Sequence, residues 1–237
     1  MVLKTCAGVE RKSLLQTLEA QRIVRLELEH ISNYADFAEA GHLSRVQSIC
    51  WVLACRASTT QYKEDISGEQ AINIAFASAL HDIGKVGIPS KIIDKPGRLT
   101  KVEFDIMKEH THIGVDIINR VAKNIKKCQY LKTAKNIAMY HHEKWDGTGY
   151  PHGKAGKDIP ISARVCAIAD VYDALREKRA YKKAFTHEEA IEAMKNERGT
   201  HFDPVLLDVF LEYSKDIEIS FRNKKEISIN ELMLAVK

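Results

Sequence analysis

Apolar residues recur every three or four positions along most of this 237-residue sequence. In the stretch 14–37, for example, Ile23, Leu26, Tyr34 and Phe37 fall on one face of a helix. Few segments show the alternation of apolar and polar residues that is typical of half-buried strands. No internal repeat or low-complexity region interrupts the pattern. The spacing therefore predicts an almost entirely helical fold.

Helix-start signals mark several of the expected helices. Thr100 and Thr186 are each followed three residues later by a glutamate, which is the pattern of a capping box. Asp203 precedes Pro204, and this pair suits an N-cap residue and the first helical position. Residues 214–237 alternate charged with apolar side chains, a pattern that leaves both a short hairpin and a helix open there.

The composition is that of an ordinary globular protein, with 45% hydrophobic and 29% charged residues. No apolar run approaches the roughly 18 residues that cross a bilayer, and residues 1–12 lack the apolar core of an export signal. Five scattered cysteines without a Cys-x-x-Cys pair indicate reduced thiols. We therefore expect a cytoplasmic protein with no membrane partner. The net charge of +4 slightly favours a small anion and does not point to a nucleic-acid polymer.

Two adjacent histidines, His141 and His142, stand before a glycine-rich loop that contains Gly149, Tyr150 and Pro151. Neighbouring imidazoles suit metal binding, but such a pair also occurs as ordinary polar residues at a helix end. This stretch alone leaves both interpretations open. Glycine lets the backbone approach a ligand closely, and the tyrosine ring offers a face on which a planar base can stack.

Further histidines and aspartates flank predicted helices, most of them beside a glycine-rich turn or in a helix of small residues. Together with the pair they form a set of seven: His42, His81, Asp82, His110, His141, His142 and Asp170. Imidazole combined with carboxylate is a ligand set for iron, manganese, zinc or nickel. A bridging carboxylate would allow two cations about 3.5 to 4 Å apart to act on one phosphodiester. General acid-base catalysis is the competing use, although it needs fewer histidines.

The order of these residues resembles the HD-GYP family, a branch of the HD-domain metal-dependent phosphohydrolases. The matching motifs are His42-x-x-Arg45, His81-Asp82-Ile83-Gly84-Lys85, His110-x-x-x-Gly114, His141-His142-Glu143, Gly147-x-Gly149-Tyr150-Pro151, Asp170-x-x-Asp173, Arg179-x-Tyr181-Lys182 and Gly199-x-x-Phe202-Asp203-Pro204. The resemblance covers about residues 30–213. It implies an all-α, HD-type helical bundle, with residues 1–30 as a linker or dimerisation helix and 31–213 as the catalytic domain. Residues 214–237 lie beyond the resemblance, and we expect them to form a small C-terminal tail, irregular or hairpin-like.

The resemblance also implies hydrolysis of cyclic di-GMP to pGpG or GMP by a hydroxide that two divalent ions, iron or manganese, activate. By the same resemblance the first ion is held by His42, His81, Asp82 and Asp170, the second by His110, His141 and His142, and Asp82 bridges them. The implied catalytic residues are Asp82 and Lys85. The implied substrate contacts are Lys85, Arg179 and Lys182 at the phosphates, with Gly149, Tyr150 and Pro151 forming the wall beside a base.

The sequence departs from the family pattern at one position. Some members carry a glutamate four residues before the first histidine, where this sequence has Ala38, with Glu39 one residue later. One residue turns about 100° around a helix, so Glu39 is not expected to substitute, and we predict two ions rather than three.

Two alternative functions stay open at this point. One is hydrolysis of another nucleotide, such as cyclic GMP-AMP or guanosine tetraphosphate, because a metal site alone does not select a base. The other is a non-catalytic cyclic di-GMP receptor, for which lost metal ligands would be the signature, and none of the seven positions is lost. The native metal, the final product and the oligomeric state are left open as well.

Overall fold

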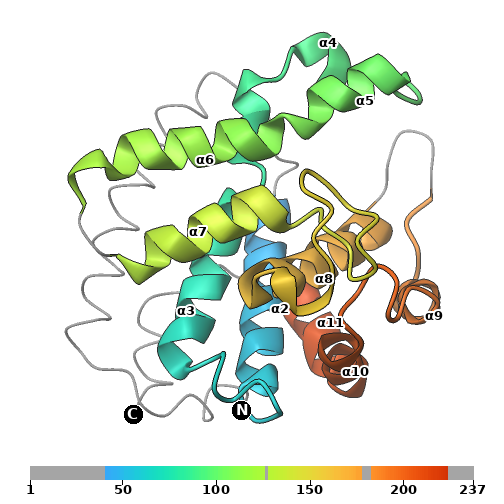
Figure 1. Ribbon diagram of the computed structural model, residues 1–237. Helices are drawn as coiled ribbons and strands as arrows, with labels where there is room; N and C mark the ends of the chain where they lie inside the picture. Colours follow the sequence, from blue (N-terminus) through green and yellow to red (C-terminus); the bar gives the residue numbers. More distant parts are fainter. Residues whose placement is uncertain (1–40, 126–127, 178–182, 224–237) are drawn as a thin grey trace.

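The computed structural model describes residues 41–125, 128–177 and 183–223 (Figure 1). The predicted N-terminal helix, Ala38, Glu39, Arg179 and Lys182 lie outside these ranges. The α-helices are α2 (His42–Ala57), α3 (Gly68–Ala77), α4 (Ser90–Ile93), α5 (Lys101–Lys108), α6 (His110–Val121), α7 (Gln129–Tyr140), α8 (Ile161–Arg176), α9 (His187–Lys195), α10 (Pro204–Glu212) and α11 (Ser214–Asn223). Short 3-10 helices are η2 (Ser78–Leu80), η3 (Ile83–Gly87), η4 (Ala122–Asn124) and η5 (Gly156–Asp158). The described residues form no strand, which confirms the prediction of an all-helical fold.

Helix α2 is the buried centre of the fold. Val46, Ile49 and Leu53 are fully buried, and most other side chains of this helix are buried as well. A helix that is apolar on nearly all sides must be covered on nearly all sides. Helices α3, α8, α10 and α11 pack around it (Figure 1). The first residue of α2, His42, is thereby held at the end of a rigid core element.

Helices α6 and α7 pack against each other, and α7 also contacts α3 and α8 (Figure 1). Helix α6 contacts η3, which follows the buried helix α3 and the short turn η2. The start of α6, the end of α7 and the turn between η2 and η3 therefore meet in space. Each of these three places carries one or two of the predicted metal ligands.

The helix starts predicted from the sequence are confirmed. The side chains of Thr100 and Thr186 each accept a hydrogen bond from the backbone amide of a glutamate, and that glutamate's carboxylate accepts one from the threonine's backbone amide, so both capping boxes are complete. Asp203 caps α10, and Pro204 is its first residue. Residues 214–223, for which a hairpin and a helix were both open, form helix α11, whose Ile217 enters the core.

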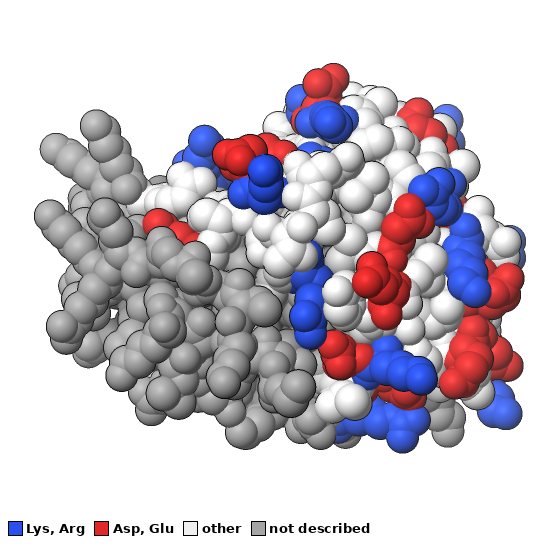
Figure 2. All heavy atoms as spheres, turned by 90° about the horizontal axis from the view of Figure 1, so that it is seen from below, with Lys and Arg blue, Asp and Glu red and all other residues white. Residues whose placement is uncertain are grey.

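Charged side chains of both signs are interspersed over the described part of the face seen in Figure 2. The described residues include exposed ion pairs, for example Arg198 with Asp208, 2.7 Å apart. The mixture agrees with the small net charge of +4. Among the described residues, none of the helices combines the length and the apolar character that spanning a bilayer requires.

Candidate metal centre

The seven predicted ligands lie together in two adjoining groups. One group contains Asp82, His110, His141 and His142, and the other contains His42, His81 and Asp170. Within each group, one possible ligand atom from every residue lies within 4.8 Å of the others. The side chains come from the start of α2, the turn after η2, the start of α6, the end of α7 and the middle of α8. Segments up to 128 positions apart in the sequence, from 42 to 170, thus meet at one place.

Asp82 belongs to the first group and also reaches the second, because it turns one carboxylate oxygen toward the histidines of each. Its Oδ2 is 3.2 Å from Nε2 of His81. Its Oδ1 is 3.4 Å from Nε2 of His110 and 3.7 Å from Nε2 of His141. This is the arrangement that a bridging carboxylate needs, because each oxygen has its own imidazole partners.

Three of the imidazoles are oriented by hydrogen bonds of their outer nitrogens. The Nδ1 atoms of His81, His110 and His141 lie 2.8, 2.7 and 2.9 Å from backbone carbonyl oxygens of their own helical turns. A carbonyl oxygen only accepts, so Nδ1 carries the proton in each ring. Nε2 of each ring therefore points into the cluster and can offer its lone pair to a metal when the ring is neutral, which is the orientation found in metal-binding histidines.

Several of these inward-facing atoms are buried without a hydrogen-bond partner. They are Oδ1 of Asp82, Nε2 of His110 and Nε2 of His141. His42 and His81 also bring their Nε2 atoms to 3.4 Å of each other. Buried acceptors that lack donors are strongly unfavourable, whereas a divalent cation satisfies nitrogen and carboxylate lone pairs together. The residues present therefore fit a metal centre.

Burial and charge give the two groups different proton affinities. Burial lowers the pKa of His110 to about 4 and holds that of His142 well below its usual range, so both rings are neutral at pH 7. Burial also lowers the pKa of His81, but the carboxylates of Asp82 and Asp170 outweigh it and raise the value to about 9, so without a metal Nε2 of this ring carries a proton at pH 7, which a bound cation would displace. Burial acts to raise the pKa of Asp82, yet His81 and Lys85 keep it well below its usual range. Ionised Asp82 thus favours a cation beside His81.

The glycine-rich loop forms a wall against the second group. The ring of Tyr150 stacks on His142, with centroids 4.7 Å apart and an interplanar angle of 28°. Gly149 is pressed against the backbone before the loop, because a Cβ there would lie 2.3 Å from the amide nitrogen of Lys144. Pro151 follows Tyr150 through a cis peptide bond. The buried carboxylate of Glu143 closes the loop by accepting hydrogen bonds from the backbone amides of residues 152 and 154.

Lys85 lies beside the bridge position. Its ammonium donates a hydrogen bond to Oδ2 of Asp82, and about a third of its side chain is exposed. A cation at this place lies next to the candidate centre and still reaches solvent. Its predicted role at a phosphate is compatible with this position, while Arg179 and Lys182 are not among the described residues.

Phe104 on α5 is a neighbour of the centre that the sequence analysis missed. Its ring is 44% exposed and meets the ring of Tyr150 edge to face, with centroids 5.7 Å apart. The sequence shows only a large apolar residue between two acidic ones, Glu103 and Asp105. Its position near Tyr150 depends on how α5 packs, which local sequence does not reveal.

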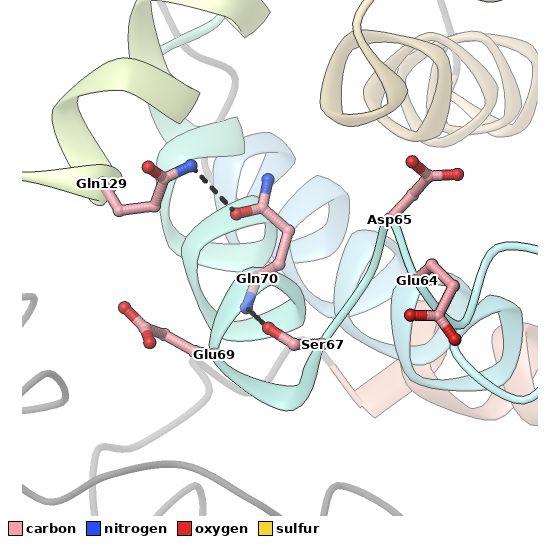
Figure 3. A pocket seen from close by; sticks show the side chains of 6 residues that line it. All are labelled: Glu64, Asp65, Ser67, Glu69, Gln70 and Gln129. Atoms are coloured by element: carbon pink, nitrogen blue, oxygen red, sulfur yellow. Dashed lines mark hydrogen bonds between the residues drawn. The ribbon is translucent and has the colours of Figure 1, made fainter.

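A surface pocket at the start of α3 is separate from the candidate centre (Figure 3). It is lined by Glu64, Asp65, Ser67, Glu69, Gln70 and Gln129. Ser67 accepts a hydrogen bond from the Gln70 amide and so caps the helix. The pocket contains none of the seven predicted ligands, and its lining has no histidine. Its chemistry therefore differs from that of the two groups around Asp82.

Comparisons with known proteins show the family of this chain. Residues 20–206 match a family model described as HD domain. A probable cyclic di-GMP phosphodiesterase of Vibrio cholerae serotype O1 is 46% identical over 193 residues, covering 81% of this chain and 44% of that protein. A cyclic di-GMP phosphodiesterase of the same organism is 38% identical over 207 residues, covering 84% and 42%. The 3'3'-cGAMP-specific phosphodiesterase 2 of this organism is 42% identical over 191 residues, covering 78% of this chain and 34% of that protein.

The chain therefore belongs to the HD-domain family, whose members are metal-dependent phosphohydrolases. The resemblance to the HD-GYP branch is confirmed by relatives that are named as cyclic di-GMP phosphodiesterases. The chain spans less than half the length of the three relatives it matches.

Proposed function

We propose that this chain is a metal-dependent phosphodiesterase that hydrolyses cyclic di-GMP to pGpG or GMP. The observation that carries the proposal is the position of Asp82, whose two oxygens face two separate groups of imidazoles. Two divalent ions, iron or manganese, would be held by His42, His81, Asp82 and Asp170 on one side and by Asp82, His110, His141 and His142 on the other. Bound there, they would supply Lewis-acid activation of water and stabilisation of the leaving oxygen.

The chain's own residues account for the rest of the reaction. Ionised Asp82 and the inward lone pairs of the histidines hold the centre in a fixed geometry. The ammonium of Lys85 lies beside Asp82, is partly exposed, and would offset the negative charge of a phosphodiester as it reacts. Tyr150 and Phe104 present aromatic surface next to His142 and suit a guanine base. Arg179 and Lys182 belong to this proposal as further phosphate contacts.

A second candidate substrate is 3'3'-cyclic GMP-AMP. One relative that is 42% identical to this chain is named as specific for it. The two dinucleotides share their phosphodiester chemistry and differ in one base, so the metal ligands do not distinguish them. The aromatic wall stacks on either purine, and selection depends on contacts to the base edges.

The first test measures hydrolysis directly. Metal-free protein is reloaded anaerobically with Mn(II) or Fe(II), and the breakdown of cyclic di-GMP and of 3'3'-cyclic GMP-AMP is followed by chromatography. We expect turnover of cyclic di-GMP to exceed that of 3'3'-cyclic GMP-AMP. Binding of cyclic di-GMP without turnover by the metal-loaded protein would instead indicate the receptor function.

Asp82→Ala should abolish both metal loading and turnover, because it removes the carboxylate that serves both groups. Elemental analysis and the chromatographic assay measure the two effects. Asp94→Ala, at an exposed aspartate outside both groups, is the matched control and should behave like wild type. Turnover that survives in Asp82→Ala would refute the bridge and the proposed function with it.

Three narrower expectations belong to the same proposal. Elemental analysis of anaerobically purified protein should give two ions per chain, and three would contradict the inference drawn from Ala38. Sedimentation analysis tests the homodimer expected through residues 1–30. The cytoplasmic location expected from the sequence is tested by cell fractionation.

A further inference from the structure

A buried carboxylate lies directly behind His42. Oδ2 of Asp173 is 2.7 Å from Nδ1 of His42, on the side of the ring that faces away from His81 and Asp170. Asp173 follows Asp170 by three residues on α8 and is fully buried. The same helix thus supplies one residue of the candidate centre and one residue that contacts a histidine of that centre from behind.

Asp173 is itself held by the guanidinium of Arg45. Nε of Arg45 donates to Oδ1 at 2.6 Å, and its terminal nitrogen donates to Oδ2 at 2.9 Å. Two parallel hydrogen bonds of this kind fix the plane of a carboxylate as well as its position. The same terminal nitrogen donates to Glu177, and Arg45 is 5% exposed. The carboxylate behind His42 is therefore fixed on both of its oxygens.

The contact between Asp173 and His42 decides which nitrogen of His42 is available to bind an ion. Both oxygens of Asp173 accept hydrogen bonds from the guanidinium of Arg45, which is always charged, so the carboxylate is held in its ionised form. An ionised carboxylate only accepts hydrogen bonds, and Nδ1 of His42 must therefore carry the proton. The lone pair of Nε2 then points toward Nε2 of His81, 3.4 Å away, and Oδ1 of Asp170, 3.8 Å away.

His42, Asp173 and Glu177 also have ligand atoms within 4.8 Å of one another, as a metal site would. The guanidinium of Arg45 already lies against both carboxylates and offsets part of their charge. The proton on Nδ1 leaves His42 no lone pair on that side. These three residues therefore surround an arginine and not a further ion.

His42 differs in this respect from the other oriented histidines. His81, His110 and His141 use backbone carbonyls of their own turns, which no substitution removes. The partner of His42 is a side chain 131 positions away in the sequence. We infer that Asp173 is a positioning residue that aims His42 at the metal centre, and that Arg45 holds Asp173 in place. The inference rests on the proposed function, because it requires an ion at His42.

Asp173→Asn is the informative substitution, because asparagine keeps the shape and removes the charge. Carboxylate partners of metal-bound histidines typically contribute 10- to 100-fold to metal affinity. We therefore expect the variant to bind one of its ions roughly 10- to 100-fold more weakly, while saturating metal restores the full number of ions. Binding is measured by titrating full-length, metal-free protein with Mn(II) and following the electron paramagnetic resonance signal of free Mn(II).

Asp203→Asn is the matched control for loss of a buried ion pair. Asp203 is as buried as Asp173 and accepts a hydrogen bond from Arg164 at 2.5 Å, but it belongs to neither histidine group. Both variants should lower the melting temperature measured in chelator, and only Asp173→Asn should weaken Mn(II) binding. Arg45→Lys keeps the charge beside Asp173 without the two-pronged contact, and we expect an intermediate loss of affinity. It also keeps the test open if Asp173→Asn does not fold.

Three results would overturn the inference. If Asp173→Asn binds Mn(II) as tightly as wild type, Asp173 has a purely structural role. If that variant does not fold, unchanged affinity in Arg45→Lys leads to the same conclusion. An ion that is lost and does not return at saturating Mn(II) would make Asp173 a ligand. Wild-type protein that binds no Mn(II) would refute the proposed function, whereas normal wild-type binding with an unaffected variant refutes this inference alone.

Discussion

At the scale of single residues, the candidate centre depends on which nitrogen each histidine turns inward. In His81, His110 and His141, Nδ1 donates a hydrogen bond to the backbone carbonyl three or four residues earlier, at residues 78, 107 and 137. This contact is local, because each acceptor lies one helical turn before its histidine. His42 lies in the first turn of α2 and uses Asp173 instead.

Phe104→Ala tests the aromatic wall at the same scale. Because Phe104 is 44% exposed, its loss should change the stability of the fold little. If its ring contacts a base, the loss should weaken substrate binding by about 1 kcal/mol, the lower end for stacking on an aromatic ring, and raise KM roughly fivefold with kcat nearly unchanged. Steady-state kinetics on cyclic di-GMP measures both constants.

Val102→Ala is the control for Phe104→Ala. Val102 lies on the same helix and is 69% exposed. It should leave KM unchanged. If both substitutions raise KM equally, the ring of Phe104 has no specific contact with the base, and any change to the surface of α5 has the same effect.

At the scale of elements, the centre depends on the close approach of η3 to α6. Gly84 in η3 faces Gly114 in α6, and a Cβ at Gly84 would lie 1.9 Å from the carbonyl oxygen of His110. That oxygen is backbone, so a side chain at position 84 could be accommodated only by moving the helix. A Cβ at Gly114 would instead make ordinary contacts of 3.4 Å or more. The contact therefore tolerates a methyl group on one side only.

Gly84→Ala and Gly114→Ala form a paired test of this contact. Overpacking of this kind destabilises by about 1 to 3 kcal/mol, and we expect Gly84→Ala to lose that much and to bind Mn(II) more weakly because His110 is displaced. Gly114→Ala should be neutral or slightly stabilising, because alanine is favoured over glycine inside a helix. Denaturant unfolding in chelator gives the stabilities. Equal losses in both variants would show that the spacing between η3 and α6 is adjustable.

At the scale of the whole molecule, the candidate centre would link helices that otherwise contact one another through the hydrophobic core. Its ligands come from α2, the turn after η2, α6, α7 and α8, and the core fills the space between these elements. Ions bound to all of them would stabilise the folded chain and not the unfolded one. The stabilisation grows with the logarithm of metal concentration above the dissociation constant.

Removing the metal should therefore lower the melting temperature of the whole fold. A single ion at a free concentration 100-fold above its dissociation constant adds about 2.7 kcal/mol of stability. We expect wild-type protein to melt several degrees lower in chelator than in Mn(II), by roughly 2 to 4 °C for each kcal/mol in a chain of this size. Calorimetry of wild type and Asp82→Ala measures this. A metal-dependent shift of the same size in Asp82→Ala would contradict the placement of the ions at Asp82.

Much of the architecture follows from local sequence. Helical spacing of apolar residues predicted the all-α fold, and the capping signals at Thr100, Thr186 and Asp203 predicted where three helices begin. These features depend on contacts within about four residues, so they can be read along the chain. The motif order also selected the seven residues that lie together, although metal binding by them stays a prediction.

Tertiary packing alone decided the relations between distant residues. The fold places Asp82 between His81 and the pair His141 and His142, a contact that the local sequence does not show. No periodicity shows that Asp173 lies behind His42, or that Phe104 meets Tyr150. The reason is physical: the sequence by itself determined local conformation and the kinds of side chain available. The directions in which those side chains meet were set by how the helices pack around α2.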